Sequence, residues 1–366
     1  MKINCEKQIL ISALSNVSRV IAAKSSIQIL EGVLMRAFDD ELTLSGYDGE
    51  FGIKTKIPAE IESEGEVVLP ARLLLDMIRK MSCESISIEV GESLGSTVKG
   101  GQAEFNINGL SADDFPQMPT VDTGNTLSFE QPVLKSMIEQ TLFAVSGNDS
   151  KPVHTGSLFD LENGVLNIVS VDGYRLAMRS ENVESTEKLS FVVPGKMLGE
   201  IVKMLSDDEG KSLNMKLSRR HIVFDIGGYT IISPLLEGEF LNYKLSIPDG
   251  YSSLVRVSTR ELIECVERAS LLISDRLRSP IRVKFTGGGI EVSCDTDIGR
   301  VHDKVDCHSE GEQVDMGFNN KYLLEALKSA GCDMVRIEIS GPLSSIKILP
   351  PENQSFLFLV LPVRLK

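Results

Sequence analysis

The same sequence pattern occurs three times, at an interval of about 124 residues. Each copy contains a strand-like apolar run that leads into an aspartate-bearing turn. The runs begin at Leu42, Leu166 and Ile290. The turns are Asp48-Gly49, Asp172-Gly173 and Asp297-Ile298-Gly299, spaced by 124 and 125 residues. This period is too long for a solenoid and matches a whole domain. It predicts three tandem domains over residues 1–120, 121–248 and 249–366.

Each copy has the same order of predicted elements. An amphipathic helix comes first, with apolar residues at helical spacing, as at Leu10, Leu14 and Val17. A second helix follows a strand that ends at Pro70 in the first copy. The second helices are predicted over 71–81, 195–205 and 320–330, and strands follow at 86–90, 213–217 and 335–339. Two helices against mostly antiparallel strands indicate an α+β domain.

Composition limits the compartment and the chemistry. The chain has 366 residues and a net charge of −14. No apolar run reaches the roughly 20 residues of a membrane span, and the first residues do not resemble a signal peptide. We therefore expect a cytoplasmic protein without membrane contact. The six cysteines are irregularly spaced, which favours reduced thiols over a disulfide framework.

Basic residues recur at matching positions of the three second helices. Arg72, Lys196 and Lys321 occupy one position. Arg79, Lys203 and Lys328 lie seven residues further on, and therefore on the same helix face. They could be solvated charges on amphipathic helices. Their repetition instead favours a surface that follows phosphates, which would reconcile nucleic-acid binding with an acidic chain.

Motifs for catalysis or metal binding are weak. Gly210-Lys211-Ser212 lacks the first glycine of a phosphate loop, because position 205 is a leucine. Gly287-Gly288-Gly289 is typical of a hairpin turn. A zinc site from Cys294, His302, Cys307 and His308 is disfavoured by irregular spacing on predicted strands. A hydrolase that uses Asp295 or Asp297 stays a remote alternative. We expect no enzyme, no metal and no cofactor.

Three segments carry a family resemblance. Val171–Ala177, Leu110–Pro116 and Val360–Leu365 resemble signature segments of the bacterial DNA polymerase III beta subunit, the sliding clamp. The resemblance runs the full length of the chain. It implies three clamp domains per subunit, and two subunits that close head to tail into a six-domain ring. Such a ring would encircle duplex DNA without sequence specificity and serve as a processivity factor in DNA replication.

The resemblance also implies partners and sites. The partners would be double-stranded DNA, a second copy of the chain, the polymerase III alpha subunit, the clamp-loader delta subunit and other proteins with a clamp-binding motif. The repeated helix positions and the family match together suggest DNA contacts at Lys24, Arg72, Asn148, Lys151, Lys196 and Lys321. The dimer interface would use Phe105, Leu271 and Leu272.

A peptide-binding groove is implied between the second and third domains. Its residues would be His154, Val171, Gly173, Tyr174, Arg175, Leu176, Leu241, Leu343, Ser345, Leu359, Leu361, Pro362, Val363 and Arg364. Leu176, Leu361 and Val363 would form apolar walls, and Arg175 with the backbone at Gly173 would hold polar atoms of the peptide. The chain departs from the family at His154, at Leu241 and at an additional last residue, Lys366. The alternative from another class is a threefold-repeat peptide-binding scaffold that does not encircle DNA.

Overall fold

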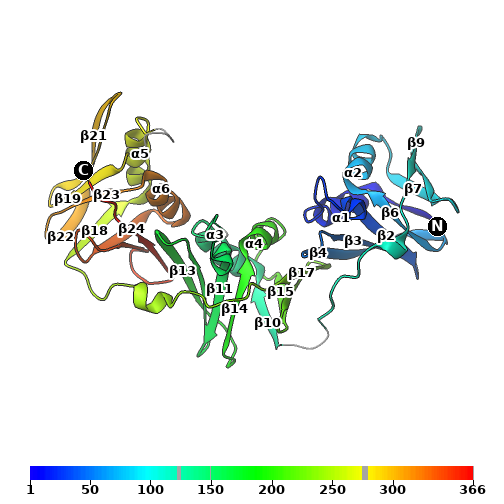
Figure 1. Ribbon diagram of the computed structural model, residues 1–366, viewed down its shortest axis with the longest axis horizontal. Helices are drawn as coiled ribbons and strands as arrows, with labels where there is room; N and C mark the ends of the chain where they lie inside the picture. Colours follow the sequence, from blue (N-terminus) through cyan, green and yellow to red (C-terminus); the bar gives the residue numbers. More distant parts are fainter. Residues whose placement is uncertain (122–124, 149, 274–278, 366) are drawn as a thin grey trace. The chain divides into compact units, whose positions relative to one another are not determined.

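The computed structural model describes residues 1–121, 125–148, 150–273 and 279–365, so the additional Lys366 lies outside the described residues. In this part the chain forms six α-helices and twenty-six β-strands (Figure 1). The helices are α1 (Lys7–Val17), α2 (Ala71–Lys80), α3 (Gln131–Leu142), α4 (Gly195–Val202), α5 (Thr259–Ser270) and α6 (Asn320–Ser329). None of them is long and apolar enough to cross a membrane.

The chain divides into two compact units, which are residues 1–132 with 203–235 and residues 133–202 with 236–366. The first unit holds α1, α2 and two antiparallel sheets. The five-stranded sheet runs β5 (Glu60–Ser63), β1 (Lys2–Glu6), β7 (Ser85–Val90), β8 (Gly95–Gly100) and β9 (Ala103–Asn108). The eight-stranded sheet runs β10 (Asn125–Glu130), β15 (Ser212–Leu217), β16 (His221–Ile226), β17 (Tyr229–Pro234), β4 (Gly52–Pro58), β3 (Glu41–Tyr47), β2 (Gly32–Phe38) and β6 (Gly65–Pro70).

The second unit holds most of α3, together with α4, α5, α6 and two further antiparallel sheets. The nine-stranded sheet runs β14 (Leu189–Pro194), β11 (Gly156–Glu162), β12 (Val165–Val171), β13 (Arg175–Asn182), β26 (Phe356–Val360), β25 (Ile346–Leu349), β24 (Met334–Ile339), β18 (Ser253–Ser258) and β22 (Cys307–Gly311). The four-stranded sheet runs β21 (Gly299–Val305), β20 (Gly289–Thr296), β19 (Ile281–Thr286) and β23 (Val314–Phe318).

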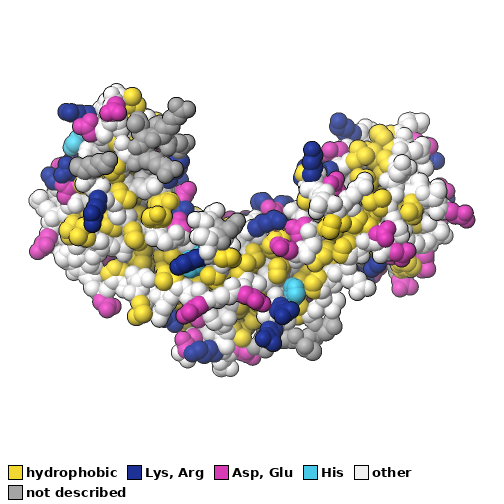
Figure 2. Space-filling model, in the orientation of Figure 1, with side chains coloured by type: hydrophobic (Ala, Val, Ile, Leu, Met, Phe, Trp, Pro, Cys, Tyr) yellow, Lys and Arg dark blue, Asp and Glu magenta, His cyan; other side chains and the backbone are white. Residues whose placement is uncertain are grey.

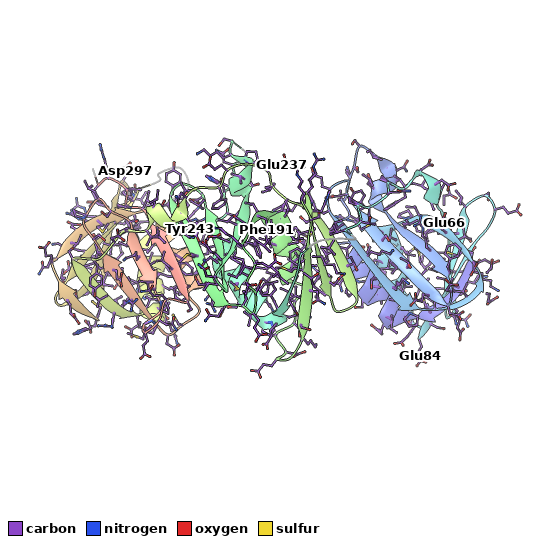
Figure 3. All side chains as sticks on the ribbon, turned by 90° about the horizontal axis from the view of Figure 1, so that it is seen from below. Glu66, Glu84, Phe191, Glu237, Tyr243 and Asp297 are labelled. Carbon is purple, nitrogen blue, oxygen red and sulfur yellow. The ribbon has the colours of Figure 1, made fainter. Side chains whose placement is uncertain are left out.

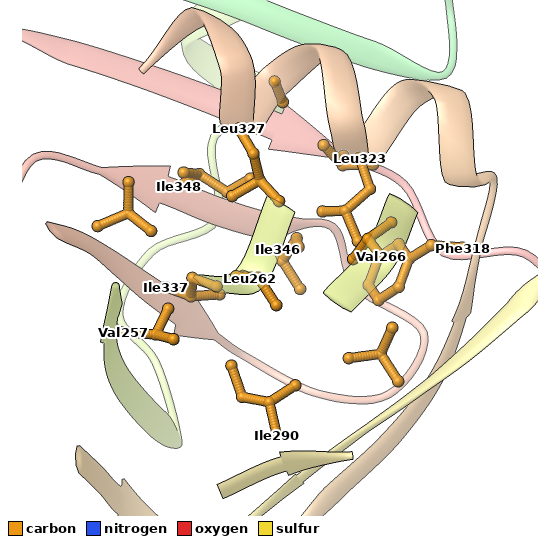
Figure 4. Close-up of a cluster of buried hydrophobic side chains, with 14 of the residues drawn as sticks. Val257, Leu262, Val266, Ile290, Phe318, Leu323, Leu327, Ile337, Ile346 and Ile348 are labelled. Carbon is orange, nitrogen blue, oxygen red and sulfur yellow. The ribbon is translucent and has the colours of Figure 1, made fainter. Parts of the chain in front are cut away.

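The third repeat shows how the sequence forms its helices and core. Ser258 caps α5 by accepting a hydrogen bond from the backbone N–H of Glu261. Asn319 caps α6 in the same way. Apolar residues at helical spacing on both helices, such as Leu262 and Leu323, then pack onto strand residues such as Ile290 (Figure 4). Burial of this cluster holds the helices against the sheets.

The predicted α+β architecture of three clamp domains is confirmed, including all six predicted helices. The helix predicted over 195–205 ends earlier, at Val202. The equivalence of Asp297 with Asp48 and Asp172 is wrong by one residue. Thr296 is paired with Gly299 across a two-residue turn, so Thr296 takes the place of the two aspartates. The spacing of the turns is therefore 124 residues throughout. The predicted domain boundaries stay predictions.

Strand pairs join successive repeats. β4 of the first repeat pairs with β17 of the second, and β13 of the second pairs with β26 of the third. In each case the strand after the two-residue turn meets the last strand of the following repeat. β9 and β21, the corresponding strands at the two ends of the series, lie at sheet edges.

Candidate functional site

The floor of the predicted groove is the strand pair β13–β26. Leu176 lies directly opposite Leu359, and both side chains are about 2% exposed. With Val171 they belong to one buried apolar cluster. Side chains alternate along a strand, so the neighbouring residues Ala177 and Phe358 point to the opposite side of the sheet. We call the side that carries Leu176 and Leu359 the outer face. That other side, which packs against α5 and α6, is the helix face.

The segment between the second and third repeats covers part of the outer face. Tyr243, labelled in Figure 3, is buried in the same cluster. Leu236, Phe240 and Ile247 are partly buried and packed against it. The phenol of Tyr243 donates a 2.6 Å hydrogen bond to Asp160. Burial and this carboxylate raise the pKa of Tyr243. The segment is therefore fixed to the sheet, and it borders the predicted groove.

Exposed apolar side chains surround this floor. Leu361 is 41% exposed, and its backbone N–H donates to Tyr174 O at 3.0 Å, which extends the β13–β26 ladder. Tyr174 is 58% exposed and Leu241 is 41% exposed. Ser345 immediately precedes β25, whose Ile346 lies opposite Val360. Leu343, on the preceding loop, is 86% exposed. A buried apolar floor with an exposed apolar rim suits a short linear peptide.

The tail beyond Leu361 is docked on the third repeat. Val363 donates its N–H to Gly317 O at 2.8 Å, and a side chain at Gly317 would clash with the Leu365 side chain. Val363, Arg364 and Leu365 border a cavity of about 1350 Å³ that also reaches Arg300 of β21. Pro362 is half-buried between the rim and this docked segment.

Arg175 lies on the helix face, away from Leu176. Its guanidinium bonds to Asp172 at 2.9 Å and to Glu325, and it lies 4.5 Å from the centre of the Tyr322 ring. The Tyr322 ring in turn stacks on Tyr174, with centroids 5.7 Å apart. Arg175 is thus held by partners within the chain, and it positions the turn that carries Gly173 and Tyr174. Sequence reasoning missed Tyr322; its place one residue after Lys321 on α6 gave no separate signal.

His154 packs beside the floor. Its ring meets Phe240 edge to face, with centroids 5.3 Å apart. Burial, and secondarily the charge of Lys151, lower the pKa of His154. A lowered pKa favours the uncharged imidazole, so His154 presents an aromatic surface beside the floor, at a position where the resemblance implies a leucine.

The equivalent place at the β4–β17 junction is filled by the chain itself. Gly52 is the equivalent of Leu176 in this junction, and it is paired with Ile232 of β17. A Cβ at Gly52 would lie 2.3 Å from Cε of Met118. Met118 also packs on the buried cluster that contains Tyr47. The thioether therefore occupies this place, and the second junction is the one with an exposed apolar rim.

The candidate DNA contacts are all exposed. They are Lys24, Arg72, Asn148, Lys151, Lys196 and Lys321. Arg72, Lys196 and Lys321 lie in the first turns of α2, α4 and α6. A cation there opposes the helix dipole by a few tenths of a kcal/mol, so helix stability does not explain its repetition. Figure 2 shows Lys and Arg side chains on the surface over α2 and α4.

The candidate dimer residues lie beside the two edge strands. Phe105 of β9 is 39% exposed, and Leu271 at the end of α5 is 81% exposed. The side chain of Leu272 lies near Gly299 of β21, since a Cβ built at Gly299 would be 3.9 Å from its Cδ1. Exposed apolar groups at a strand edge are typical of an interface.

The described residues contain no cluster of three or more His, Cys, Asp or Glu suited to a metal ion. All six cysteines are free, and burial raises the pKa of Cys5 and Cys265 to about 12, which suppresses thiolate chemistry. Asp295 forms an ion pair with Arg300 at 2.8 Å. Gly287-Gly288 forms the predicted hairpin turn between β19 and β20. These residues act in structure.

Comparison with known proteins gives full-length matches. Profiles of the N-terminal, central and C-terminal domains of the DNA polymerase III beta subunit match residues 1–119, 128–242 and 244–364. The beta sliding clamp of Halalkalibacterium halodurans is 32% identical over 98% of both chains. The Bacillus subtilis clamp structure has a TM-score of 0.96 at 28% identity over 100% of both chains. A Pseudomonas aeruginosa clamp solved bound to griselimycin has a TM-score of 0.94 at 27% identity, also over 100% of both chains.

Proposed function

Because the chain belongs to the DNA polymerase III beta subunit family, the beta sliding clamps, we propose that two copies form a ring around duplex DNA. A member of this family is a non-catalytic processivity factor of DNA replication. In the proposal, the exposed basic residues of α2, α4 and α6 face the DNA, and the groove at the β13–β26 junction holds partner peptides. The partners are the polymerase alpha subunit, the clamp-loader delta subunit and other proteins with the same motif.

The observation that carries the groove assignment is the contrast between the two junctions. At β4–β17 the chain places Met118 over Gly52, whereas at β13–β26 the apolar rim of Tyr174, Leu361 and Leu241 is exposed. A tethered polymerase stays at high effective concentration near the primer end, so the ring promotes synthesis without chemistry of its own.

Leu361→Asp tests the groove. Leu361 is exposed, so the substitution should leave the fold intact while placing a charge in the peptide's apolar contact. Leu176→Asp is unsuitable, because Leu176 is buried and the charge would unfold the sheet. A titration with a clamp-binding peptide should show at least about a tenfold weaker Kd, corresponding to about 1.4 kcal/mol.

The matched control is Leu73→Asp, which changes an exposed leucine of α2. It should leave the peptide Kd unchanged. Equal affinity of the Leu361→Asp protein and the control, with both folded and dimeric, would contradict the groove assignment and leave the ring standing.

The ring is tested separately by Leu271→Ala with Leu272→Ala. These side chains lie at the C-terminal end of α5 beside the β21 edge, where a second copy would cover them. Removing both should shift the protein from dimer to monomer in a sizing measurement at low micromolar concentration. A variant that stays fully dimeric would show that these leucines do not form the contact.

A further inference from the structure

The first helices of the three repeats begin at equivalent residues. The first residue of each donates its backbone N–H, at 2.8 Å, to the residue just before the strand that follows the second helix. The fourth residue of each is a buried leucine. These first residues are Lys7, Gln131 and Thr259. The ninth residues are therefore equivalent as well, and they are Ser15, Glu139 and Glu267.

The second helices align in the same way. Counted from the start of each helix, the ninth residues are Arg79, Lys203 and Lys328. In the first repeat, Nη2 of Arg79 donates a 3.1 Å hydrogen bond to Oγ of Ser15. In the third repeat, Nζ of Lys328 lies 2.7 Å from Oε1 of Glu267. The same contact thus joins the two helices in both repeats, with a neutral partner in one and a carboxylate in the other.

The difference in charge extends over the whole helix pair. Four basic residues and one acidic residue lie on α1 and α2, whereas α5 and α6 carry four of each. On α5, Arg260 pairs with Glu264 at 2.8 Å, and Arg268 pairs with an aspartate of β21 at 2.6 Å. Lys7 and Arg79 of the first repeat instead donate to uncharged oxygens, a carbonyl and a hydroxyl. The helices of the third repeat are therefore neutral as a pair, and those of the first are positive.

Helix stability does not account for this difference. Arg79 and Lys328 both lie in the last turn of their helices, where the helix dipole favours a cation. The dipole explains why a cation recurs, but not why it meets a carboxylate in the third repeat. The side chains of Lys328 and Glu267 are 55% and 47% exposed, and such exposed ion pairs add little to stability. The effect of Glu267 must therefore lie at the surface.

We infer that Glu267 cancels the charge that Lys328 would offer to DNA, so that the first repeat, through Arg79, holds phosphates more strongly than the third. The inference rests on the proposed function, in which α2 and α6 face duplex DNA, and adds a residue that limits DNA affinity. The carboxylate lies far inside the screening length of about 10 Å at 0.1 M salt. A phosphate therefore meets a neutral pair in the third repeat and an uncancelled guanidinium in the first.

This uneven surface suits a ring that moves along DNA. Each cation that neutralises a phosphate releases a counterion and adds to the affinity, whatever the base sequence. Every such contact must also be broken when the ring moves. Glu267 removes one contact of this kind from each subunit without removing the cation that completes α6. It thereby lowers the affinity for DNA while the helix keeps its favourable charge.

Glu267→Gln tests the inference directly. The amide keeps the size of the side chain but leaves Lys328 free to bind a phosphate. The plot of log affinity against log salt should become steeper by roughly one, and binding should tighten about fivefold at ~0.1 M salt. Fluorescence anisotropy with duplex DNA of random sequence measures both quantities. Thermal unfolding and sizing should be unchanged, because the pair is exposed.

The matched control is Glu41→Gln on β3. Glu41 is 48% exposed and lies 2.6 Å from Nζ of Lys56, so it closely resembles Glu267 in exposure and pairing. It lies on a strand, outside the helix surface assigned to DNA. Its substitution should leave the affinity and the salt slope unchanged. An equal gain from Glu41→Gln would show that only the overall charge of the chain matters, and would overturn the inference.

Two further variants test whether the effect passes through the paired cation. Adding Lys328→Gln to Glu267→Gln should abolish the gain, because no cation remains to be released. Ser15→Glu should place a carboxylate beside Arg79 and flatten the salt slope by roughly one, as Arg79→Gln should also do. A gain that persists without Lys328 would contradict the assigned role of Glu267.

Failure of the inference can be told apart from failure of the proposed function. If the unmodified protein binds duplex DNA with a salt-dependent affinity that Glu267→Gln does not change, the inference is wrong and the ring is unaffected. If the unmodified protein shows no salt-dependent binding to duplex DNA, and is not retained on a nicked circle after loading, the proposed function itself is wrong.

Discussion

At the residue scale, the candidate site is governed by the alternation of side chains along β13. Leu176 belongs to the outer face and Arg175 to the helix face, so two neighbours assigned to one groove have different surroundings. The family resemblance identified both positions, and the alternation could have separated them. The contact of Arg175 with Tyr322 and Glu325 could not be predicted, because it joins segments about 150 residues apart.

Arg175→Met should cost about 2 kcal/mol of the free energy of unfolding. The substitution leaves the largely buried Asp172 with backbone donors alone and removes the cation from the Tyr322 ring. Urea unfolding measures the change. Lys244→Met removes a more exposed ion pair to Asp160 and should cost less than about 1 kcal/mol. Equal costs for the two variants would contradict the positioning role of Arg175.

His154 should make the protein more sensitive to acid. Its folded-state pKa lies below the ordinary value of 6.5. As the pH falls below about 6.5, the unfolded chain binds a proton that the folded protein resists, so the free energy of unfolding decreases until the folded-state pKa is reached. His154→Leu should show a smaller drop in Tm between pH 7.5 and 5.5 than the unmodified protein.

The control for this pH effect is His308→Leu, which changes an exposed histidine of β22. It should not reduce the acid-dependent drop in Tm. If His154→Leu and His308→Leu proteins lose stability equally on acidification, the environment of His154 is not the cause.

At the element scale, the repeat in the sequence predicted the helices well, because each carries apolar residues at helical spacing and each recurs at the same place in the repeat. Side-chain caps add a start signal at α5 and α6. Aligning the three turns by their aspartates places the turn of the third repeat one residue too late. In the structure Thr296 supplies the side-chain oxygen, donating from Oγ1 to Gly299 O, whereas Asp48 and Asp172 accept from backbone N–H groups. Different side chains can therefore serve the same hairpin.

Lys24, in the loop after α1, and the first-turn cations of the second helices should contribute to DNA affinity through phosphates. Lys24→Ala with Lys196→Ala should reduce the slope of log affinity against log salt by roughly one per residue replaced. Fluorescence anisotropy with duplex DNA of random sequence measures the slope. Lys188→Ala, an exposed lysine paired with Glu162, serves as the control and should leave the slope unchanged. An unchanged slope for the double variant would place the DNA-binding face elsewhere.

At the scale of the whole molecule, a ring binds DNA topologically. After loading onto a nicked circle, the protein should stay bound through gel filtration at high salt, and cutting the circle once should release it. A peptide-binding scaffold that does not encircle DNA would give the same retention on circular and linear DNA. Retention after linearisation, without blocks at the DNA ends, would contradict the ring.

The chain carries both halves of its proposed subunit contact, β9 in one unit and β21 in the other. In such a heterologous contact each added copy still offers a free edge, so only closure of the ring ends the addition of further copies. A closed pair leaves no strand edge of this type exposed, whereas a pair that fails to close can keep adding copies. Damage to the junctions within a subunit, rather than to β9 or β21, is therefore expected to give open polymers. The same edges that make a replication ring would then serve as the repeat contact of a filament.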